Sequence, residues 1–329
     1  MQRWSVLVDE ATLEEMALLP MSHIGGHAEN LISSRPTYRN LYRAWDRQQW
    51  SSEGLRLDQD AEEWSRLSAG TRRRLERVIQ HFLVSEYAAT ETMAPIMTGA
   101  PDETALLFLG GQAADEARHA RLMDRIGSEV LGVHEEDLRQ ALTLSWQHST
   151  PAQRAYVGME GRIVRQLDSP QAGLTDWLQA VALFHVVAEG VMGVTAQRNL
   201  LSALKSSDTL QGVRAGFTAL TRDESRHIAF GVEAVRRGLA NAPQERVDAV
   251  AHTLREALAM VAVVELPTEP TRSERILAWK FGRQLQAEAE VRLRALGIRP
   301  EVNQWIRDGM AAPLDGLRRQ IRHAGAQHA

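Results

Sequence analysis

The chain has 329 residues, 44% of them hydrophobic, which is enough for one large domain or two small ones with a substantial core. It has no cysteine, so disulfides, thiolate metal ligands and a cysteine nucleophile are excluded, and a metal would need oxygen and nitrogen ligands. The net charge of −4, without a strongly basic stretch, gives no support for nucleic-acid binding.

The start of the chain, MQRWSVLVDEATLEEM, is too acidic and too interrupted for a signal peptide. No apolar run approaches the roughly 18 residues of a membrane span, so we expect a soluble, cytoplasmic protein without membrane contact. Residues 1–59 have a less regular pattern than the rest, and His23–His27 reads as a loop. Because no long linker follows, we expect residues 1–59 to be an extension packed on one domain of residues 60–329.

Helix-forming residues prevail from Asp60 onward, and the alternating pattern of β-strands is missing, so the sequence predicts an all-α fold. Helix stops followed by a capping residue or a proline mark the predicted breaks. These breaks lie at 98–101, 148–151, 168–170, 241–243, 267–270 and 297–300. They delimit helices of about 25 to 35 residues in a single bundle with additional terminal helices.

The first buried acid is predicted on the helix spanning 72–97. Its apolar stripe runs through Val78, Phe82, Ala89 and Met93, and Glu86 lies on that stripe. Glu91 is rotated about 140° away from Glu86, so it is expected to face solvent. Glu86 is therefore the candidate ligand of this helix.

Two near-identical pentapeptides follow, DEARH at 115–119 and DESRH at 223–227. Each contains a glutamate and a histidine three residues apart, which lie on one face of a helix and can bind one cation together. The pairs are Glu116 with His119 and Glu224 with His227, and both continue apolar stripes. One such pair on an amphipathic helix is usually a solvated pair, whereas two buried copies favour metal binding.

The remaining acid lies in AVALFHVVAEGVMGV at 180–194, a segment that is apolar nearly all round and is expected to be central. Glu189 is its only acid, and a buried carboxylate is costly unless it is paired or bound to metal. His185, one turn earlier, is either a seventh ligand or, more commonly at such a position, a histidine that supports a ligand or packs in the core.

Together, four glutamates and two histidines from four helices match the pattern of di-metal carboxylate proteins. Four negative charges offset two divalent cations, and hard oxygen ligands suit iron or manganese. The ligand types do not distinguish an Fe/Fe from a Mn/Fe pair, since both ions accept carboxylates and imidazoles.

At these residues the chain resembles the ribonucleotide reductase small-subunit superfamily of the ferritin-like fold. The resemblance runs from about 40 to 240 and includes the segment 41–64, which is similar to the family's N-terminal signature. DEARH, FHVVAEG and RDESRHIAFG look especially like the ligand-binding oxidase branch. The resemblance implies a ferritin-like helical bundle that activates dioxygen and is commonly a homodimer.

The resemblance also implies roles for individual residues. Glu86, Glu116 and His119 would hold one metal, and Glu189, Glu224 and His227 the other, with bridging carboxylates between the ions. Trp50, Asp223 and His119 fall where reductase subunits have an electron-transfer relay. For Asp223, the alternative is a hydrogen bond that only orients a metal-binding histidine.

Three positions and the tail of the chain depart from the family's patterns. Met123 stands where the reductases have their radical tyrosine, and the tail from Gln320 to Ala329 has no tyrosine. Ala89 and Phe184 stand where the ligand-binding oxidases have a valine and a tyrosine that become cross-linked. Because that self-oxidation is impossible at these positions, the oxidising equivalents are free to act on an external substrate.

The leading hypothesis is therefore a dinuclear non-haem metal oxidase or oxygenase, with Glu86, Glu189, Asp223 and Trp50 taking part in catalysis. Its substrates would be dioxygen and a small apolar or amine-bearing molecule, by hydroxylation, desaturation or N-oxygenation. The sequence identifies neither that molecule nor the electron donor. One alternative is a radical-generating subunit of a reductase that lacks the usual tyrosyl radical. Another is a metal-storage or purely structural bundle.

Overall fold

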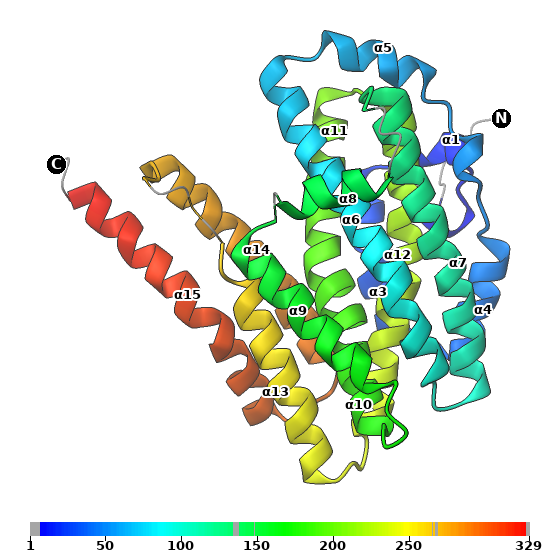
Figure 1. The fold of residues 1–329 in the computed structure, drawn as a ribbon, viewed down its shortest axis with the longest axis vertical. Helices are drawn as coiled ribbons and strands as arrows, with labels where there is room; N and C mark the ends of the chain where they lie inside the picture. Colours follow the sequence, from blue (N-terminus) through cyan, green and yellow to red (C-terminus); the bar gives the residue numbers. More distant parts are fainter. Residues whose placement is uncertain (1–6, 134–137, 148, 265, 267–268, 327–329) are drawn as a thin grey trace. The chain divides into compact units, whose positions relative to one another are not determined.

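The computed structural model describes residues 7–133, 138–147, 149–264, 266 and 269–326, and these ranges hold helices and no β-strand (Figure 1). The all-α fold expected from the sequence is therefore confirmed. His148 and Pro267, which belong to two of the predicted breaks, lie outside the described residues. At the first, α8 (Leu138–Gln147) ends before the break and α9 (Pro151–Gln166) begins at its last residue; at the second, α13 (Gln244–Val261) ends before the break and α14 (Arg272–Ala295) begins after it.

Contacts along the chain divide it into two compact units. The first unit comprises Met1–His148 and Ala196–Ala229, and the second comprises Ser149–Thr195 and Phe230–Ala329. Each unit is thus assembled from two separate stretches of sequence. The expected division into an extension of residues 1–59 and a domain of residues 60–329 stays a prediction.

Short helical elements open the first unit. They are η1 (Val8–Glu10), α1 (Leu13–Met16), α2 (Met21–Ile24), α3 (His27–Ser33), α4 (Tyr38–Arg47), η2 (Ser52–Gly54) and α5 (Asp58–Arg66). The loop expected at His23–His27 is wrong at both ends, because α2 extends to Ile24 and α3 begins at His27. The buried Arg222 of α12 (Gln211–Leu239) ties this region to that helix, because it donates to the carbonyls of Ala11 and Gln48.

Longer helices follow, and capping side chains define where they begin. They are α6 (Ala69–Thr98), α7 (Glu103–Arg125), the π-helical η3 (Ile126–Val130) and α8 (Leu138–Gln147). Ser68 accepts from the amide of Thr71 at the start of α6, and Asp102 accepts from the amides of Thr104 and Ala105 at the start of α7. α6 and α7 pack against each other, as do α4 and α7.

The start of α12 (Gln211–Leu239) is held by a side chain from another helix. The buried carboxylate of Asp60 on α5 accepts from the amides of Gly212, at 3.2 Å, and Val213, at 2.6 Å. A Cβ at position 212 would lie 2.3 Å from the carbonyl oxygen of Arg56, so only glycine allows this approach. α5 thereby satisfies amides that an isolated helix would leave without partners.

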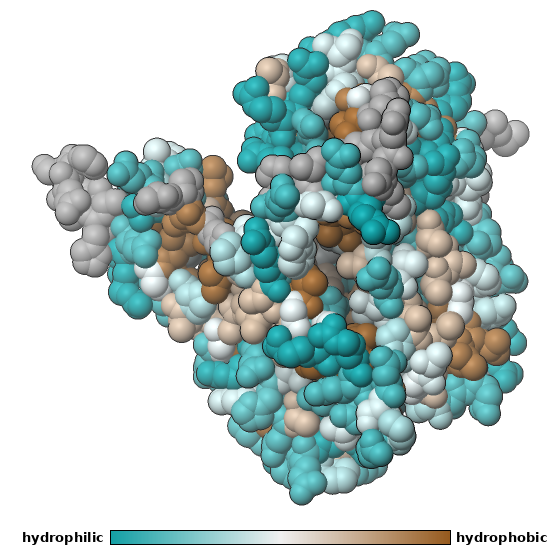
Figure 2. Space-filling view, viewed as in Figure 1, coloured by the Kyte–Doolittle hydropathy of each residue, from teal (hydrophilic) through white to brown (hydrophobic). Residues whose placement is uncertain are grey.

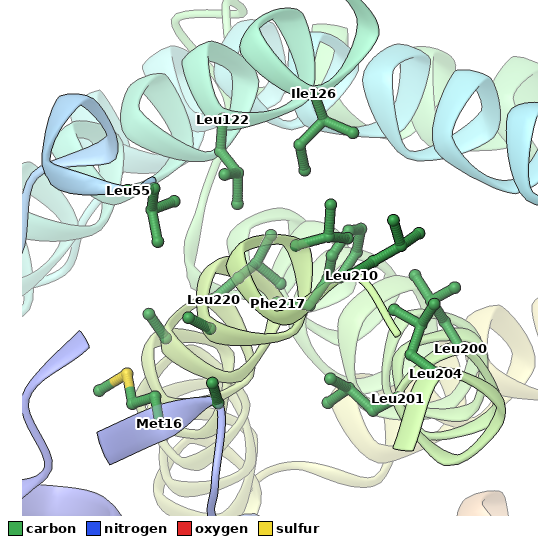
Figure 3. Close-up of a cluster of buried hydrophobic side chains, with 14 of the residues drawn as sticks. Met16, Leu55, Leu122, Ile126, Leu200, Leu201, Leu204, Leu210, Phe217 and Leu220 are labelled. Carbon is green, nitrogen blue, oxygen red and sulfur yellow. The ribbon is translucent and has the colours of Figure 1, made fainter. Parts of the chain in front are cut away.

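Part of the hydrophobic core of the first unit lies where α7 and η3 pack against α12 (Figure 3). Leu122 of α7 and Ile126 of η3 face Phe217 and Leu220 of α12. Leucines of α11 (Val194–Ser207) complete the cluster, namely Leu200, Leu201 and Leu204. This packing fixes how α7 and α12 lie along each other.

The second unit is built from helices of very different length. Besides α12 from Phe230 onward, they are α9 (Pro151–Gln166), α10 (Leu174–Val181), the π-helical η4 (Ala182–Gly193), α13 (Gln244–Val261), α14 (Arg272–Ala295) and α15 (Pro300–Ala326). α13 and α14 each pack on both α15 and η4. Arg292 of α14 is fully buried and donates to the carbonyl oxygen of Gly190 at 3.0 Å.

The expected helix length of about 25 to 35 residues is right for some helices and wrong for others. α6 has 30 residues and α12 has 29, whereas α9 has 16. The chain also turns at places without proline. Gly132 adopts φ 70° between η3 and α8, and Asp208 and Leu210 adopt φ 47° and 55° between α11 and α12.

One helical stretch, Leu174–Ser207, is long and apolar enough to cross a membrane by length and composition alone. The expectation that no apolar run approaches that length is therefore wrong for this stretch. Its most apolar window is 78% buried inside the protein, as in the core helix of a soluble fold. Polar residues prevail on the face shown in Figure 2, with apolar residues in smaller patches.

Candidate metal centre

Three helices of the first unit bring five of the predicted ligands together. α6 carries Glu86, α7 carries Glu116 and His119, and α12 carries Glu224 and His227. All five are at most 5% exposed. Burying three carboxylates in one place is unfavourable unless positive charge accompanies them.

Four of these residues surround a single point. Glu86, Glu116, His119 and Glu224 each offer one ligand atom, and these atoms all lie within 4.8 Å of one another. Nδ1 of His119 is 3.5 Å from a carboxylate oxygen of Glu86, 3.5 Å from one of Glu224 and 3.8 Å from one of Glu116. Because metal–oxygen and metal–nitrogen bonds are about 2 Å long, ligands of one ion lie at such separations.

Two of the glutamates divide their oxygens between the two histidines. Glu116 directs Oε2 toward Nδ1 of His119 at 3.8 Å and Oε1 toward Nδ1 of His227 at 3.3 Å. Glu224 directs Oε1 toward His119 at 3.5 Å and Oε2 toward His227 at 3.8 Å. The two imidazole rings are 6.1 Å apart. This is the arrangement that carboxylates bridging two cations require.

The outer nitrogen of each histidine contacts an aspartate of the other pentapeptide. Nε2 of His119 lies 3.2 Å from Oδ2 of Asp223, and Nε2 of His227 lies 3.1 Å from Oδ2 of Asp115. An acceptor on Nε2 holds the proton there and leaves Nδ1 as the lone-pair nitrogen that faces the carboxylates. Trp50, which the sequence placed near the cluster, donates its indole N–H to Asp223 at 2.7 Å.

Two arginines link the aspartates to each other. Arg226 donates to Asp115 at 3.0 Å and to Asp223 at 2.6 Å. Arg118 also bonds to both, with 3.1 Å to Asp223. The two positive charges offset the two aspartates, so the negative charge of the three glutamates remains to be balanced by a cation inside the cluster.

The pKa values of the buried groups show the same shortage of positive charge. Burial raises the pKa of Glu86 to about 7. Burial acts to lower the pKa of His119, but the neighbouring carboxylates of Asp223, Glu224 and Glu86 outweigh it and raise this pKa well above the usual value. Burial opposes ionisation of Glu224, yet the two histidines bring its pKa down to about 2. Protons on Glu86 and His119 thus stand in for the missing positive charge.

Buried ligand atoms without a hydrogen-bond partner also indicate that this cluster binds metal. Among the described residues, Nδ1 of His119 and Oε2 of Glu224 are buried and have no hydrogen-bond partner. Buried polar atoms rarely lack a hydrogen-bond partner unless a ligand binds to their lone pairs. Both atoms face the interior of the cluster.

The sixth predicted ligand, Glu189, belongs to the second unit, where it lies on η4 and is 8% exposed. His185, on the same segment, is fully buried. Its ring packs 4.9 Å from Phe184 and 5.3 Å from Phe230. Such aromatic surroundings are those of a core histidine, the alternative that the sequence left open beside a metal ligand.

Three residues of the centre were missed by sequence reasoning: Asp115, Trp45 and Gln112. Trp45 donates its indole N–H to Asp115 at 3.0 Å, and Gln112 donates to Glu116 at 3.3 Å. The repeat held the signal for Asp115, because it precedes Glu116 as Asp223 precedes Glu224.

Comparison with known proteins agrees with this geometry. The family model of the small chain of ribonucleotide reductase matches residues 33–266. The chain belongs to the ribonucleotide reductase small-chain family.

Solved structures of the same fold are R2-like ligand-binding oxidases. The one from Sulfolobus acidocaldarius is 21% identical with a TM-score of 0.65, and the match covers 80% of this chain and 92% of that one. A point mutant of such an oxidase with an aerobically reconstituted Mn/Fe cofactor is 17% identical, with a TM-score of 0.63 and coverage of 81% and 93%. The fold is thus the ferritin-like helical bundle of these structures.

Proposed function

We propose that this protein is a dinuclear non-haem metal oxidase or oxygenase that uses dioxygen to oxidise a small organic molecule. The observation that carries the proposal is the pair of buried glutamates, Glu116 and Glu224, that each direct one oxygen toward each histidine. Two metals bound side by side require glutamates that are shared in this way, and few other arrangements do.

The proposed ligand set assigns Glu86, Glu116 and His119 to one metal and Glu224 and His227 to the other. Glu189 is proposed as the sixth ligand because it is the one acid of a nearly all-apolar helix and the family's pattern requires an acid there. The set suits an Fe/Fe or a Mn/Fe pair, and the similar oxidases with a Mn/Fe cofactor support the second.

When bound, the metal pair would supply the electrons and the open coordination positions at which dioxygen is reduced. The chain's own residues keep the site ready for it. Asp115 and Asp223 fix which nitrogen of each histidine faces the metals, and Arg118 and Arg226 neutralise these aspartates. Met123, which is fully buried, helps to exclude water.

The proposed substrate is an external molecule, small and apolar or bearing an amine. Its support is Ala89 and Phe184, which cannot form the cross-link of the ligand-binding oxidases. The proposed reaction is a hydroxylation, a desaturation or an N-oxygenation of that molecule, with electrons from an external donor. We further propose a homodimer in the cytoplasm.

The test is to reduce the metal-loaded protein anaerobically, add dioxygen with candidate apolar acids and aryl amines, and analyse the products by mass spectrometry. An oxidised product that Glu86→Ala does not form supports the proposal. Stoichiometric metal without dioxygen consumption or product would refute the oxygenase.

A second candidate is a radical-generating reductase subunit, which the contact of Trp50 with Asp223 and His119 favours. Trp50 and His119 stack with ring centroids 6.4 Å apart. Met123 at the position of the radical tyrosine weighs against it. A stable complex with a large reductase subunit that reduces nucleotides would support this alternative.

A further inference from the structure

The metal centre has two chains of tryptophan, aspartate and histidine, related by the repeat. The first, Trp50–Asp223–His119, is the relay expected from the family resemblance. The second is Trp45–Asp115–His227. Nε1 of Trp45 donates to Oδ1 of Asp115 at 3.0 Å, and Oδ2 of the same carboxylate lies 3.1 Å from Nε2 of His227. Each histidine of the proposed pair thus connects through one carboxylate to its own indole.

The second chain continues beyond the indole. The ring of Tyr42 lies 5.3 Å from the ring of Trp45, with an angle of 36° between their planes. Both residues lie on α4 and are half-buried, so the pair leads from the buried carboxylate toward solvent. Two easily oxidised rings in contact provide steps for a single electron.

The indole of Trp45 packs directly against Gly111 of α7, where the Cβ of any other residue would clash. A Cβ at Gly111 of α7 would lie 2.9 Å from Cδ2 of Trp45 and 3.1 Å from Cε2. Any other residue there would displace the ring from Asp115.

The two indoles have different ring neighbours. The guanidinium carbon of Arg118 lies 5.0 Å from the centre of the Trp50 ring, and a positive charge over a ring disfavours removal of an electron from it. Arg118 also bonds to Asp115, the acceptor of the Trp45 N–H, but the ring that packs against Trp45 is a phenol, which is itself oxidisable. Trp45 therefore has a neighbour to which it can pass an oxidising equivalent.

We propose that Tyr42 and Trp45 form a second one-electron path, which connects the surface of α4 to His227 and its metal. This inference rests on the proposed metal pair but not on the oxygenase reaction. The path lets a one-electron reductant of the solution reach the centre, and it drains an oxidising equivalent that no substrate has consumed.

Each step along the path conserves electrons and protons. Trp45 gives one electron to the oxidised centre and becomes a radical, while its indole N–H remains hydrogen-bonded to the carboxylate of Asp115. Tyr42 then returns one electron to Trp45 and releases its phenolic proton to solvent. An external one-electron reductant and a proton from solvent finally restore Tyr42, so the centre gains one electron and the protein is unchanged.

The test follows the reduction of the oxidised centre by reduced methyl viologen in a stopped-flow instrument without oxygen. The centre is oxidised beforehand with hydrogen peroxide, because only a strongly oxidised centre can take an electron from an indole, so the measurement needs no reaction with dioxygen. We expect Tyr42→Phe and Trp45→Phe to slow the reduction by about tenfold, a typical effect of residues beyond the ligands. Metal content, measured by mass spectrometry, should stay at the wild-type value in both variants.

Matched variants separate electron transfer from positioning. Tyr42→Phe keeps a ring beside Trp45, so a purely positioning role of Trp45 predicts no change in this variant. Tyr87→Phe is the control, since Tyr87 lies on α6 near Arg121 and Asp124. Trp45→Tyr restores an oxidisable ring and should recover part of the rate.

The outcomes are distinct. Slow reduction in both path variants, with Tyr87→Phe unchanged, supports the path. A wild-type rate in Tyr42→Phe overturns it, even if Trp45→Phe is slow, because Trp45 then only holds Asp115. A wild-type protein that binds no metal overturns both the path and the proposed function, whereas normal metal content and reduction without dioxygen chemistry removes the proposed function alone.

Discussion

Single residues of the two pentapeptides serve both halves of the centre. Glu116 and His119 supply one pair of candidate ligands, while their neighbour Asp115 holds His227 of the other pentapeptide. The spacing of the repeat predicts which side chains share a helix face. It does not predict that each aspartate contacts the histidine of the other pentapeptide, because that depends on how α7 and α12 pack.

Glu86 makes metal binding sensitive to pH. Burial raises its pKa to about 7, and the pKa of His119 is also raised, so both groups must lose a proton to bind a cation. Metal affinity should therefore rise between about pH 6 and pH 8, by up to about tenfold per pH unit for each proton released. Anaerobic titration with Fe(II) measures this, and Glu86→Gln should flatten the profile. An affinity independent of pH over this range would contradict the assignment.

Glu160, on α9 of the second unit, is a buried acid with an oxygen, Oε1, that has no hydrogen-bond partner among the described residues. Burial raises its pKa from 4.5 to about 7. The folded state therefore holds this proton more tightly than the unfolded state, and stability falls as pH rises from about 4.5 through 7.

Glu160→Gln should remove that loss. At pH 8 we expect the free energy of unfolding in urea to rise by about 1–3 kcal/mol, with no gain near pH 4.5. Glu245→Gln, an exposed acid of the same unit, is the control. Equal effects of Glu160→Gln at the two pH values would show that its charge is not the cause.

At the scale of helices, the start of α12 depends on α5. Asp60→Ala would leave two amides without an acceptor and should lower the free energy of unfolding by about 1–3 kcal/mol. Asp58→Ala is the matched control, because Asp58 is exposed and 3.8 Å from Arg56. A urea titration that finds the same stability in both variants would contradict the role of Asp60.

The sequence predicted helix breaks better than helix lengths. Breaks at which proline follows a glycine or an asparagine, such as 98–101 and 241–243, fall between helices, whereas Pro95 and Pro313 alone do not end α6 and α15. The turn after α11 was missed, because Asp208 and Leu210 take positive φ values that their residue types do not signal. The π-helical turns of η3 and η4 were also missed, since the hydrophobic period barely distinguishes them from α-helix.

For the whole molecule, composition and repeats were enough for the class and for most of the candidate ligands. All-α structure and family membership are confirmed, because apolar stripes and the paired motifs are local features. The two units, each made of two separate stretches, were not foreseen, because such a division depends on contacts between distant residues. The same holds for Trp45, whose partner Asp115 is 70 positions away.

The most direct test of the central claim is the metal content of the purified protein, measured by mass spectrometry after expression with iron and manganese supplied. We predict about two metals per chain, lost or reduced in Glu116→Ala and Glu86→Ala but kept in Glu91→Ala, whose side chain is exposed on the same helix as Glu86. Negligible metal in the wild-type protein, even after anaerobic reconstitution, would contradict the account and leave the repeated motif a structural feature.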